Sequence, residues 1–255
     1  DKHTKNGVSY SRIAYLSTDR LRLKHESICT FKKSGQGCFF CNVPEQGINF
    51  TQADFDEVLD ALLPHPTFRH ILIGGGSGDP LTESEQIIGL AKKIRARNKE
   101  IPIYLMSLPP NNAKILRDYK EAGITEVAFN IEIWDRTIAQ KIMPGKGKIP
   151  LSHYIDILRE STNIWGKEGN VRAALIVGLN QSKLLLTATE YLCQLGIQPM
   201  FSVFRPMIGT KLENIVPPSN QTLLSLYQDI LRICANYHME PGPSCKECRN
   251  NMLAL

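Results

Sequence analysis

The sequence lacks any apolar run long enough to cross a lipid bilayer. Its longest apolar stretches, such as residues 173–177, are far shorter than the ~20 residues that a membrane-spanning helix needs. It also lacks the charged start and apolar centre of a secretory signal peptide. We therefore expect a cytoplasmic protein with no membrane partner. The sequence begins at Asp1 and not at Met, so what precedes Asp1 stays open.

Long blocks of like charge are also absent. The 30 Lys and Arg residues and the 25 Asp and Glu residues are scattered, with no run of five or six charges of one sign. This pattern gives no nucleic-acid footprint, so we expect no nucleic-acid partner. Low-complexity segments, close internal repeats and long linkers are missing as well. We expect a lead-in over residues 1–20, one main domain over residues 21–238, and a tail over residues 239–255.

Short apolar runs alternate with amphipathic segments along the main domain. The spacing of apolar residues predicts six strands and the helices that follow them. The strands are expected at residues 21–29, 71–73, 101–106, 125–133, 171–177 and 198–204, and the helices at 51–63, 83–97, 111–121, 135–142, 151–164, 182–195 and 220–237. This alternation predicts an α/β fold of parallel strands with right-handed crossovers, either an open sheet or a barrel. In both, the working face is the carboxyl edge of the strands.

Three of the seven cysteines, Cys29, Cys38 and Cys41, follow the first predicted strand. A disulfide reading is poor, because three thiols leave one unpaired and nothing else suggests secretion. The two-residue gap between Cys38 and Cys41 lets both sulfurs face one metal centre. Three thiolates without an evident fourth ligand suggest an iron-sulfur cluster with an open coordination position. Two alternatives stay open here, a structural zinc site completed by His25 and plain buried thiols.

Polar and glycine-rich residues follow the other predicted strands. The turn of residues 74–80 has little side-chain bulk, so its main chain can approach a ligand closely. It is not a Walker A loop, because no Gly-Lys-Ser/Thr follows, and an ordinary glycine turn is the alternative. Glu132 stands among Phe129, Ile131 and Ile133 at a strand end, where a buried carboxylate requires a partner.

Four further polar residues have ordinary interpretations beside functional ones. Ser107 and Asn180 lie at strand ends, where a role as a helix cap or as a surface group is the favoured interpretation. Arg172 and Arg205 are candidates for binding a carboxylate or phosphate in a cavity, with plain ion pairing as the alternative.

The tail contains a second pair of thiols, Cys245 and Cys248, separated by two residues. The pair suits an auxiliary cluster or a reactive thiol pair, and the alternative is a reduced surface turn. A non-enzyme hypothesis combines it with Cys38 and Cys41 in the four-thiolate zinc site of a binding module. The other two cysteines, Cys193 and Cys234, fall in helical segments and are expected in the core.

Taken together, residues 21–237 resemble the radical S-adenosylmethionine (radical SAM) superfamily, and most of all its biotin synthase and lipoyl synthase branch. Members carry a Cys-x-x-x-Cys-x-x-Cys loop that binds three irons of a [4Fe-4S] cluster. The matching residues are Cys29, Cys38 and Cys41, with the aromatic Phe40 before the last cysteine. The first gap holds eight residues here, where three are common. The combination of motifs favours the cluster over zinc.

The resemblance extends to the other strand ends. The turn of Gly74, Gly75 and Gly76 with Asp79 is similar to the Gly-Gly-Glu-Pro turn that holds the methionyl amino group, and Asp79 stands where Glu is usual. Asn130-Ile-Glu132 is similar to a lipoyl synthase motif and implies that Glu132 contacts S-adenosylmethionine. Residues 174–178 resemble the stretch that packs on the adenine. The resemblance also implies cofactor-binding roles for residues at two further strand ends, Ser107 and Arg205.

The resemblance implies a fold and a reaction. The fold is a partial (βα)6 TIM-like barrel of parallel strands. The reduced cluster cleaves S-adenosylmethionine to a 5′-deoxyadenosyl radical, which abstracts hydrogen from a small-molecule substrate. The electron comes from a donor such as flavodoxin or ferredoxin. An auxiliary cluster at Cys245 and Cys248 would favour sulfur insertion, and its absence a rearrangement or another biosynthetic step.

Overall fold

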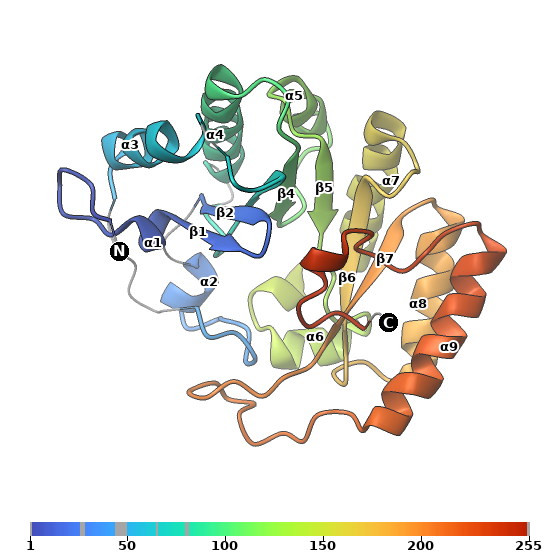
Figure 1. Ribbon diagram of the computed structural model, residues 1–255. Coiled ribbons are helices and arrows are strands. Elements are labelled where there is room, and N and C mark those ends of the chain that lie inside the picture. The colour runs from blue at the N-terminus through green and yellow to red at the C-terminus, as the bar shows by residue number, and fades with distance from the viewer. Residues whose placement is uncertain (1, 26–28, 44–49, 65, 80–81, 254–255) are drawn as a thin grey trace. The chain divides into compact units, whose positions relative to one another are not determined.

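The computed structural model describes residues 2–25, 29–43, 50–64, 66–79 and 82–253. The chain divides into two compact units (Figure 1). The first unit holds Asp1–Ser34 and Val43–Val127, and the second holds Gly35–Asn42 and Ala128–Leu255. The predicted thiol loop is therefore shared, with Cys29 in the first unit and both Cys38 and Cys41 in the second.

The first unit is built on strands that follow one another in chain order. Strand β1 runs antiparallel to β2, and β2, β3 and β4 are parallel, with Leu21 opposite Ile71 and Ile71 opposite Ile103. Its elements are α1 (Tyr10–Ile13), β1 (Ala14–Ser17), β2 (Arg20–Lys24), α2 (Thr30–Lys33), α3 (Gln52–Leu62), β3 (His70–Gly74), α4 (Glu83–Arg97), β4 (Ile103–Ser107) and α5 (Ile115–Glu121).

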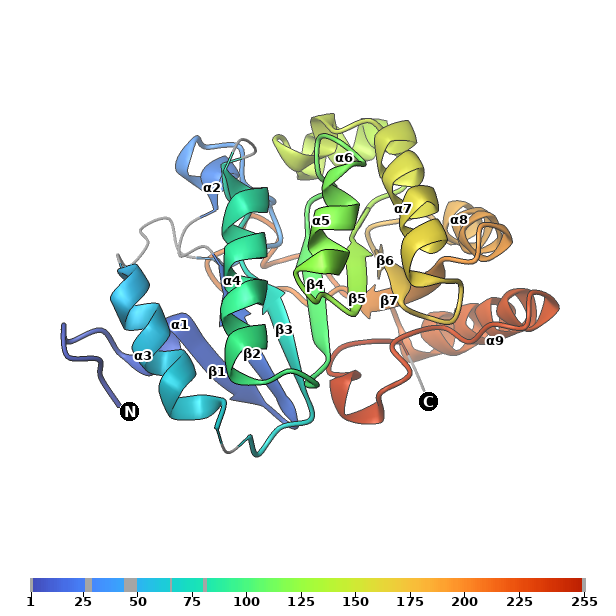
Figure 2. The ribbon, with the colours of Figure 1, turned by 90° about the horizontal axis from the view of Figure 1, so that it is seen from above.

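Helix α4 shows why this unit folds as the apolar pattern predicts. Its buried residues Ile87, Leu90, Ala91 and Ile94 recur at helical spacing, so they form one apolar stripe. The apolar residues of β2 and β3, such as Leu23 and the Ile71–Ile73 run, are buried as well. Helix α4 contacts α3 on one side and α5 on the other, and the row of helices is seen from above in Figure 2.

Besides residues 35–42, the second unit holds the chain from within β5 (Glu126–Phe129) onward, including the parallel pair of β6 and β7. Strands β6 and β7 pair in register from Arg172 opposite Gln198 to Val177 opposite Val203. Helix α8 contacts both strands and also α9, which lies beside it in both ribbon views (Figures 1 and 2). The remaining elements are α6 (Arg136–Ile142), η1 (Lys146–Lys148), α7 (Leu151–Trp165), β6 (Val171–Val177), α8 (Ser182–Gln194), β7 (Gln198–Val203), α9 (Asn220–Asn236) and η2 (Lys246–Cys248).

The tail runs back along β7. The Gly242 N–H donates to the Pro199 carbonyl at 2.8 Å, near the start of the strand. Near its end, the Val203 N–H donates to the Asn251 carbonyl at 2.8 Å, and the Leu253 N–H to the Phe201 carbonyl at 2.7 Å. These bonds satisfy main-chain groups that an unpaired strand edge would leave open. Residues 254–255 of the predicted tail lie outside the described part of the chain.

Most predicted elements are found, and the differences have local causes. Helix α4 and strand β6 have the predicted bounds. The lead-in contains α1 and the antiparallel strand β1, which the polar pattern did not indicate because Tyr15 and Leu16 of β1 are exposed. Strand β5 ends at Phe129 and not at residue 133, because the backbone changes direction at Glu132. Residues 26–28 of the first predicted strand lie outside the described residues.

None of the helices among the described residues is both long and apolar enough to span a membrane.

A close backbone approach in the second unit requires glycine at position 147. Its N–H donates to the Met143 carbonyl at 2.6 Å, and a Cβ there would collide with the Ala139 carbonyl of α6. We expect Gly147→Ala to lower the free energy of unfolding by about 1–3 kcal/mol, the usual cost of overpacking. Gly89→Ala is the matched control, because a Cβ on this residue of α4 meets no atom within 4 Å. It should raise stability by up to about 1 kcal/mol in urea unfolding. Equal effects of the two substitutions would contradict this assignment.

A carboxylate at the start of α3 ties this helix to the N-terminal segment. Asp54 accepts hydrogen bonds from the Thr4 hydroxyl at 2.6 Å, from the Thr51 hydroxyl and N–H at 2.7 and 2.8 Å, and from Asn6 at 3.1 Å. The bonds from Thr4 and Thr51 lower the pKa of Asp54 from 3.8 to about 2. The ionised form is therefore favoured in the folded protein.

This pKa gives the pH dependence a definite sign. A depressed folded-state pKa adds stability above pH 3.8 that is lost as the pH falls towards 2. Asp54→Asn should therefore destabilise the apoprotein at pH 7, and the difference from wild type should shrink between about pH 4 and 2. Urea unfolding across this range measures it. Asp118→Asn, at an exposed site on α5, is the control and should show no such convergence. A constant deficit at all pH values would refute the assignment.

Candidate functional site

The thiol segment of the second unit is fixed to α6 and the turn after it. The Phe39 N–H donates to the Ile142 carbonyl, and the Gly145 N–H to the Gln36 carbonyl, both at 2.9 Å. The side chains of Cys38 and Phe40 pack against the buried group of Ile133, Ala139 and Met143. Cys38 and Cys41 lie in one turn, closed by a 3.1 Å bond from the Cys41 N–H to the Cys38 carbonyl, and both are half-buried and free of disulfides.

Glu132 follows β5 in a backbone conformation that is rare for a residue with a side chain. Its φ is +63°, in the left-handed region. Its N–H donates to the Ala174 carbonyl, and its own carbonyl accepts from the Ile176 N–H, both at 2.8 Å. These bonds to β6 hold Glu132 in place. Such backbone strain persists only where the surroundings enforce it, and it is concentrated at functional sites.

The Asn180 side chain holds the same turn from the other side. Its amide nitrogen donates to the Glu132 and Ile176 carbonyls, both at 2.8 Å. Its amide oxygen accepts from the Trp134 N–H at 2.8 Å. Asn180 is therefore neither a simple helix cap nor a free surface group. It braces the backbone on both sides of Ile133.

The Glu132 carboxylate has the partner that its surroundings require. The Lys146 ammonium lies 3.0 Å from its Oε1, and the two side chains are only 13% and 16% exposed. Burial lowers the pKa of Lys146, but the attraction of Glu132, Tyr154 and Cys38 outweighs burial and raises the pKa above its usual value. Lys146 therefore stays charged beside the Cys38 thiol. A nearby cation favours the thiolate, which is the form that binds metal.

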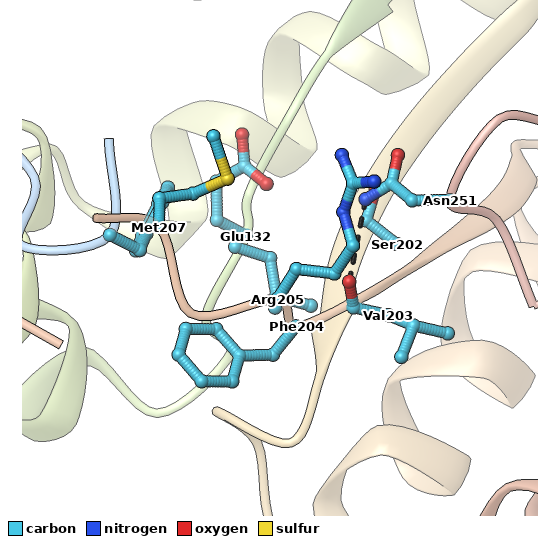
Figure 3. A pocket seen from close by; sticks show the side chains of 9 residues that line it. Glu132, Ser202, Val203, Phe204, Arg205, Met207 and Asn251 are labelled. Carbon is cyan, nitrogen blue, oxygen red and sulfur yellow. Dashed lines mark hydrogen bonds between the residues drawn. The ribbon is translucent and has the colours of Figure 1, made fainter. Parts of the chain in front are cut away.

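Glu132 lines a cavity of about 200 Å³ (Figure 3). Predicted cofactor-binding residues from three separate segments, Phe40, Glu132 and Arg205, line it. Asn251 of the tail also lines it, and its amide nitrogen donates to the Val203 carbonyl at 3.4 Å. The other lining residues are Ile176, Ser202, Val203, Phe204 and Met207. The cavity thus combines a carboxylate, a guanidinium and two neutral polar side chains with apolar walls.

The glycine turn belongs to the first unit. Gly74 ends β3, Gly75 has a φ of +153°, and Gly76 is buried. The Asp79 carbonyl accepts the Thr82 and Glu83 N–H groups of the first turn of α4, at 3.0 and 2.8 Å. The last residue of the predicted turn, Pro80, lies outside the described residues.

Cys29 immediately precedes α2 in the same unit and is half-buried and free of disulfides. The next residue, Thr30, binds the glycine turn through its N–H, which donates to the Ser77 carbonyl at 2.9 Å. Within this unit, Cys29 and the glycine turn are therefore neighbours.

Two predicted cofactor residues at strand ends make local hydrogen bonds. The Ser107 hydroxyl, at the end of β4, donates to the Leu108 carbonyl at 3.0 Å. The Asn130 amide oxygen accepts the Ala174 N–H at 3.2 Å and so helps to attach the Glu132 turn to β6.

The structure corrects two expectations. Arg172 does not lie at the cavity, because it is near the amino end of β6, where its Nε donates to Gln198 at 2.9 Å. Cys245 and Cys248 lie near the amino end of β7, since the adjacent Ser244 meets the Gln198 side chain at 3.3 Å. In the part of the chain that the structure describes, these thiols are not gathered with Cys38 and Cys41 within metal-ligand range, so the zinc module with four thiolates is wrong. As expected, Cys193 and Cys234 are buried, with Sγ atoms 3.8 Å apart.

The donor set fits the cluster that the motifs imply. Cys29, Cys38 and Cys41 are half-buried and not in disulfides, and the charged Lys146 lies near Cys38. Thiolates are the protein ligands of [4Fe-4S] clusters. His25, the fourth ligand of the zinc alternative, has its Nε2 2.8 Å from Glu83 Oε1. His25 Nδ1 is buried and lacks a hydrogen-bond partner among the described residues.

Sequence reasoning missed three residues of this site, which are Lys146, Asn180 as a brace, and Asn251. Lys146 lies in a Lys- and Gly-rich turn that resembles an ordinary surface loop. A buried Glu132 carboxylate requires a partner, and this requirement was a usable signal, but it did not identify Lys146 as the partner. Nothing in the local sequence around Asn251 indicates that the tail reaches the cavity.

Comparison with known proteins identifies the family. The sequence matches the Radical SAM superfamily over residues 25–181, which is more than half of the chain. The chain belongs to the radical SAM superfamily. This family implies S-adenosylmethionine and a [4Fe-4S] cluster as cofactors, and the chain is an enzyme of this class.

One curated relative is the bacteriochlorophyllide c C-7(1)-hydroxylase of Chlorobaculum limnaeum. It is 23% identical over 247 residues, which cover 87% of this chain and 61% of the relative. Among solved structures, methylornithine synthase (PylB) is similar with a TM-score of 0.62 and 18% identity, over 87% of this chain and 63% of PylB. The [FeFe]-hydrogenase maturase HydG from Carboxydothermus hydrogenoformans has a TM-score of 0.64 and 15% identity, over 85% of this chain and 51% of HydG.

These likenesses confirm the predicted fold class, an α/β partial TIM-like barrel of mostly parallel strands. This chain spans only 51–63% of the length of these relatives, so their particular activities are not transferred to it. The matches show that the chain belongs to the superfamily. They do not show that it belongs to the predicted branch of biotin and lipoyl synthases.

The brace by Asn180 can be tested directly. Asn180→Ala removes three hydrogen bonds that hold the left-handed turn at Glu132. We expect a loss of about 1–3 kcal/mol in urea unfolding, as for buried groups left without partners. S-adenosylmethionine should also bind about tenfold more weakly to the reconstituted enzyme. Asn163→Ala, which removes one exposed bond to Glu160 on α7, is the control. Wild-type affinity in Asn180→Ala would argue against the brace.

Proposed function

We propose that this chain binds one [4Fe-4S] cluster through Cys29, Cys38 and Cys41 and cleaves S-adenosylmethionine reductively to act on a small-molecule substrate. When bound, the cluster and S-adenosylmethionine supply a 5′-deoxyadenosyl radical that abstracts hydrogen from the substrate. The protein holds these groups, orients the target carbon and excludes water and stray hydrogen donors.

The observation that carries this proposal is the strained turn at Glu132. Its φ of +63° places a paired carboxylate in the wall of a cavity that Phe40 and Arg205 also line. Cys38 packs against the same apolar group as Phe40. A strained acidic residue with its ion partner, in the wall of a cavity that Phe40 of the thiol segment also lines, suits cofactor binding better than a structural role.

Each chain segment has a distinct role in this proposal. Main-chain groups of Gly74, Gly75 and Gly76, with Asp79, hold the methionyl amino group. Glu132 contacts S-adenosylmethionine while Lys146 holds its carboxylate in place. Phe40 covers the cofactor beside the thiols. Further cofactor contacts come from two strand ends, at Ser107 and Asn130.

Arg205 marks the substrate side. It is exposed and lines the cavity, so its guanidinium can bind a carboxylate or phosphate. Asn251 and Ser202 supply neutral polar groups beside it. We therefore propose an anionic small molecule as the substrate.

The proposal also covers the electron donor and the outcome of the reaction. The electron donor is a flavodoxin or ferredoxin in the cytoplasm, and neither nucleic acid nor a membrane takes part. The likeness to biotin and lipoyl synthases favours sulfur insertion only if an auxiliary cluster forms at Cys245 and Cys248. The position of this pair near the amino end of β7 favours a reaction without one, such as a rearrangement or another step in cofactor or metabolite biosynthesis.

Anaerobic reconstitution tests the proposal. Wild-type protein should bind about four irons per chain, show the brown colour of a [4Fe-4S] cluster, and form 5′-deoxyadenosine with a reductant and S-adenosylmethionine. Cys38→Ala should lose the iron-sulfur absorbance and all 5′-deoxyadenosine. Cys245→Ala is the matched thiol control and should keep both.

Three results would count against the proposal. A colourless zinc-containing protein would contradict the proposed cluster. Retained iron-sulfur absorbance in Cys38→Ala would contradict the assignment of Cys38 as a cluster ligand. Roughly eight irons in wild type, reduced to about four in Cys245→Ala, would show that the tail holds a second cluster.

A further inference from the structure

A buried carboxylate in the first unit joins two segments that lie far apart in the sequence. Glu83, the first residue of α4, has a side chain that is 10% exposed. Its Oε1 lies 2.8 Å from His25 Nε2, and the His25 side chain is 1% exposed. The same oxygen accepts the Gly78 N–H at 3.0 Å. One carboxylate therefore connects the chain just after β2 to the glycine turn after β3.

The chemistry of this contact sets its direction. The Glu83 Oε1 accepts the Gly78 N–H, and it accepts from His25 in the tautomer that carries a proton on Nε2. A buried charge requires such donors, and a buried donor requires its acceptor. Removing the Glu83 side chain would leave the His25 and Gly78 N–H groups unsatisfied. Water therefore does not replace the Glu83 carboxylate as the acceptor for these two groups.

Thr30 fixes the same turn from the thiol side. Its N–H donates to the Ser77 carbonyl at 2.9 Å. Its hydroxyl lies 3.1 Å from the Ser77 carbonyl and 3.0 Å from the Gly78 carbonyl and donates to this pair. Thr30 directly follows the predicted cluster ligand Cys29. Any shift of the turn at Gly78 must therefore also move the main chain at Cys29.

A simple helix-capping role does not account for Glu83. An acidic residue in the first turn favours the helix dipole from an exposed position as well, and Glu85 already provides one. The Glu83 side chain instead reaches back to Gly78, outside the helix, and to His25 on another segment. The preceding residue, Thr82, makes no side-chain capping bond.

We propose that Glu83 and Thr30 are positioning residues that couple the glycine turn to Cys29. They hold the main-chain groups of residues 74–79 in the geometry that receives the methionyl amino group. They do so without touching the cofactor themselves. This inference rests on the proposed function, because it assigns the supports of the same cofactor site.

The first test compares the affinity of the reconstituted holoenzyme for S-adenosylmethionine among variants of α4. Anaerobic equilibrium dialysis gives the Kd, with iron content and thermal unfolding measured on the same samples. Glu83→Ala should raise the Kd by about tenfold with near wild-type iron content. Glu83→Gln keeps an acceptor oxygen and should recover most of the affinity. Glu85→Ala is the control and should bind as wild type does.

The second test reaches the turn from the other side and does not depend on the folding of Glu83→Ala. Thr30→Val keeps the shape of the side chain but removes the hydroxyl, and it should raise the Kd several-fold, whereas Thr30→Ser should restore it. In the double variant Thr30→Val/Glu83→Gln, the effects on the Kd should be non-additive, because both residues act on Gly78.

The outcomes separate this inference from the proposed function. An unchanged Kd in both Glu83→Ala and Thr30→Val, within twofold of wild type, would overturn the positioning role and leave the proposed function standing. A loss of stability without a change in Kd would likewise show a structural role only. Failure of wild-type holoenzyme to bind S-adenosylmethionine at all would overturn the proposed function first.

Discussion

The second unit depends on one constraint, which is that Glu132 keeps a left-handed backbone conformation at the end of β5. Main-chain bonds to β6 and the Asn180 side chain enforce it from both sides. As a result, the Glu132 carboxylate forms an ion pair with Lys146 that is largely shielded from solvent, and it faces the cavity. Without this turn, the strand would continue and the carboxylate would point elsewhere, because side chains alternate between the faces of a strand.

The first unit solves a similar problem by similar means. Its glycine turn has little side-chain bulk, so the turn cannot hold its own shape by packing. Polar side chains replace that packing, with the buried Glu83 accepting from Gly78 and the partly buried Thr30 contacting the carbonyls of Ser77 and Gly78. In both units, loops at strand ends are held by hydrogen bonds from neighbouring segments. Such satisfied networks give a loop one geometry, which a cofactor site requires.

Much of the fold was predictable because burial leaves a periodic signal. The bounds of α4 and β6 follow from apolar spacing alone, and the class of alternating strands and helices is confirmed. Strand β1 was missed because Tyr15 and Leu16 are both exposed and the strand carries no apolar alternation. Arg172 was only a candidate for binding a carboxylate or phosphate, and it lies near the amino end of β6, where it donates to Gln198. The tail was expected as a separate segment, but its main chain pairs with β7. Main-chain pairing of this kind leaves no side-chain pattern from which it could be predicted.

The sequence by itself determined the superfamily, the order of the elements and the residues expected to hold the cofactors, because these depend on local spacing and on residue chemistry. Tertiary structure alone decided which partners those residues have. Lys146 pairs with Glu132, Asn180 braces the Glu132 turn, and Asn251 reaches the cavity from the end of the chain. Such contacts join positions 14 to 48 residues apart, and long-range contacts leave no periodic trace in the intervening sequence. The physical reason is that hydrogen bonds and ion pairs act through space, whereas sequence patterns report only neighbours along the chain.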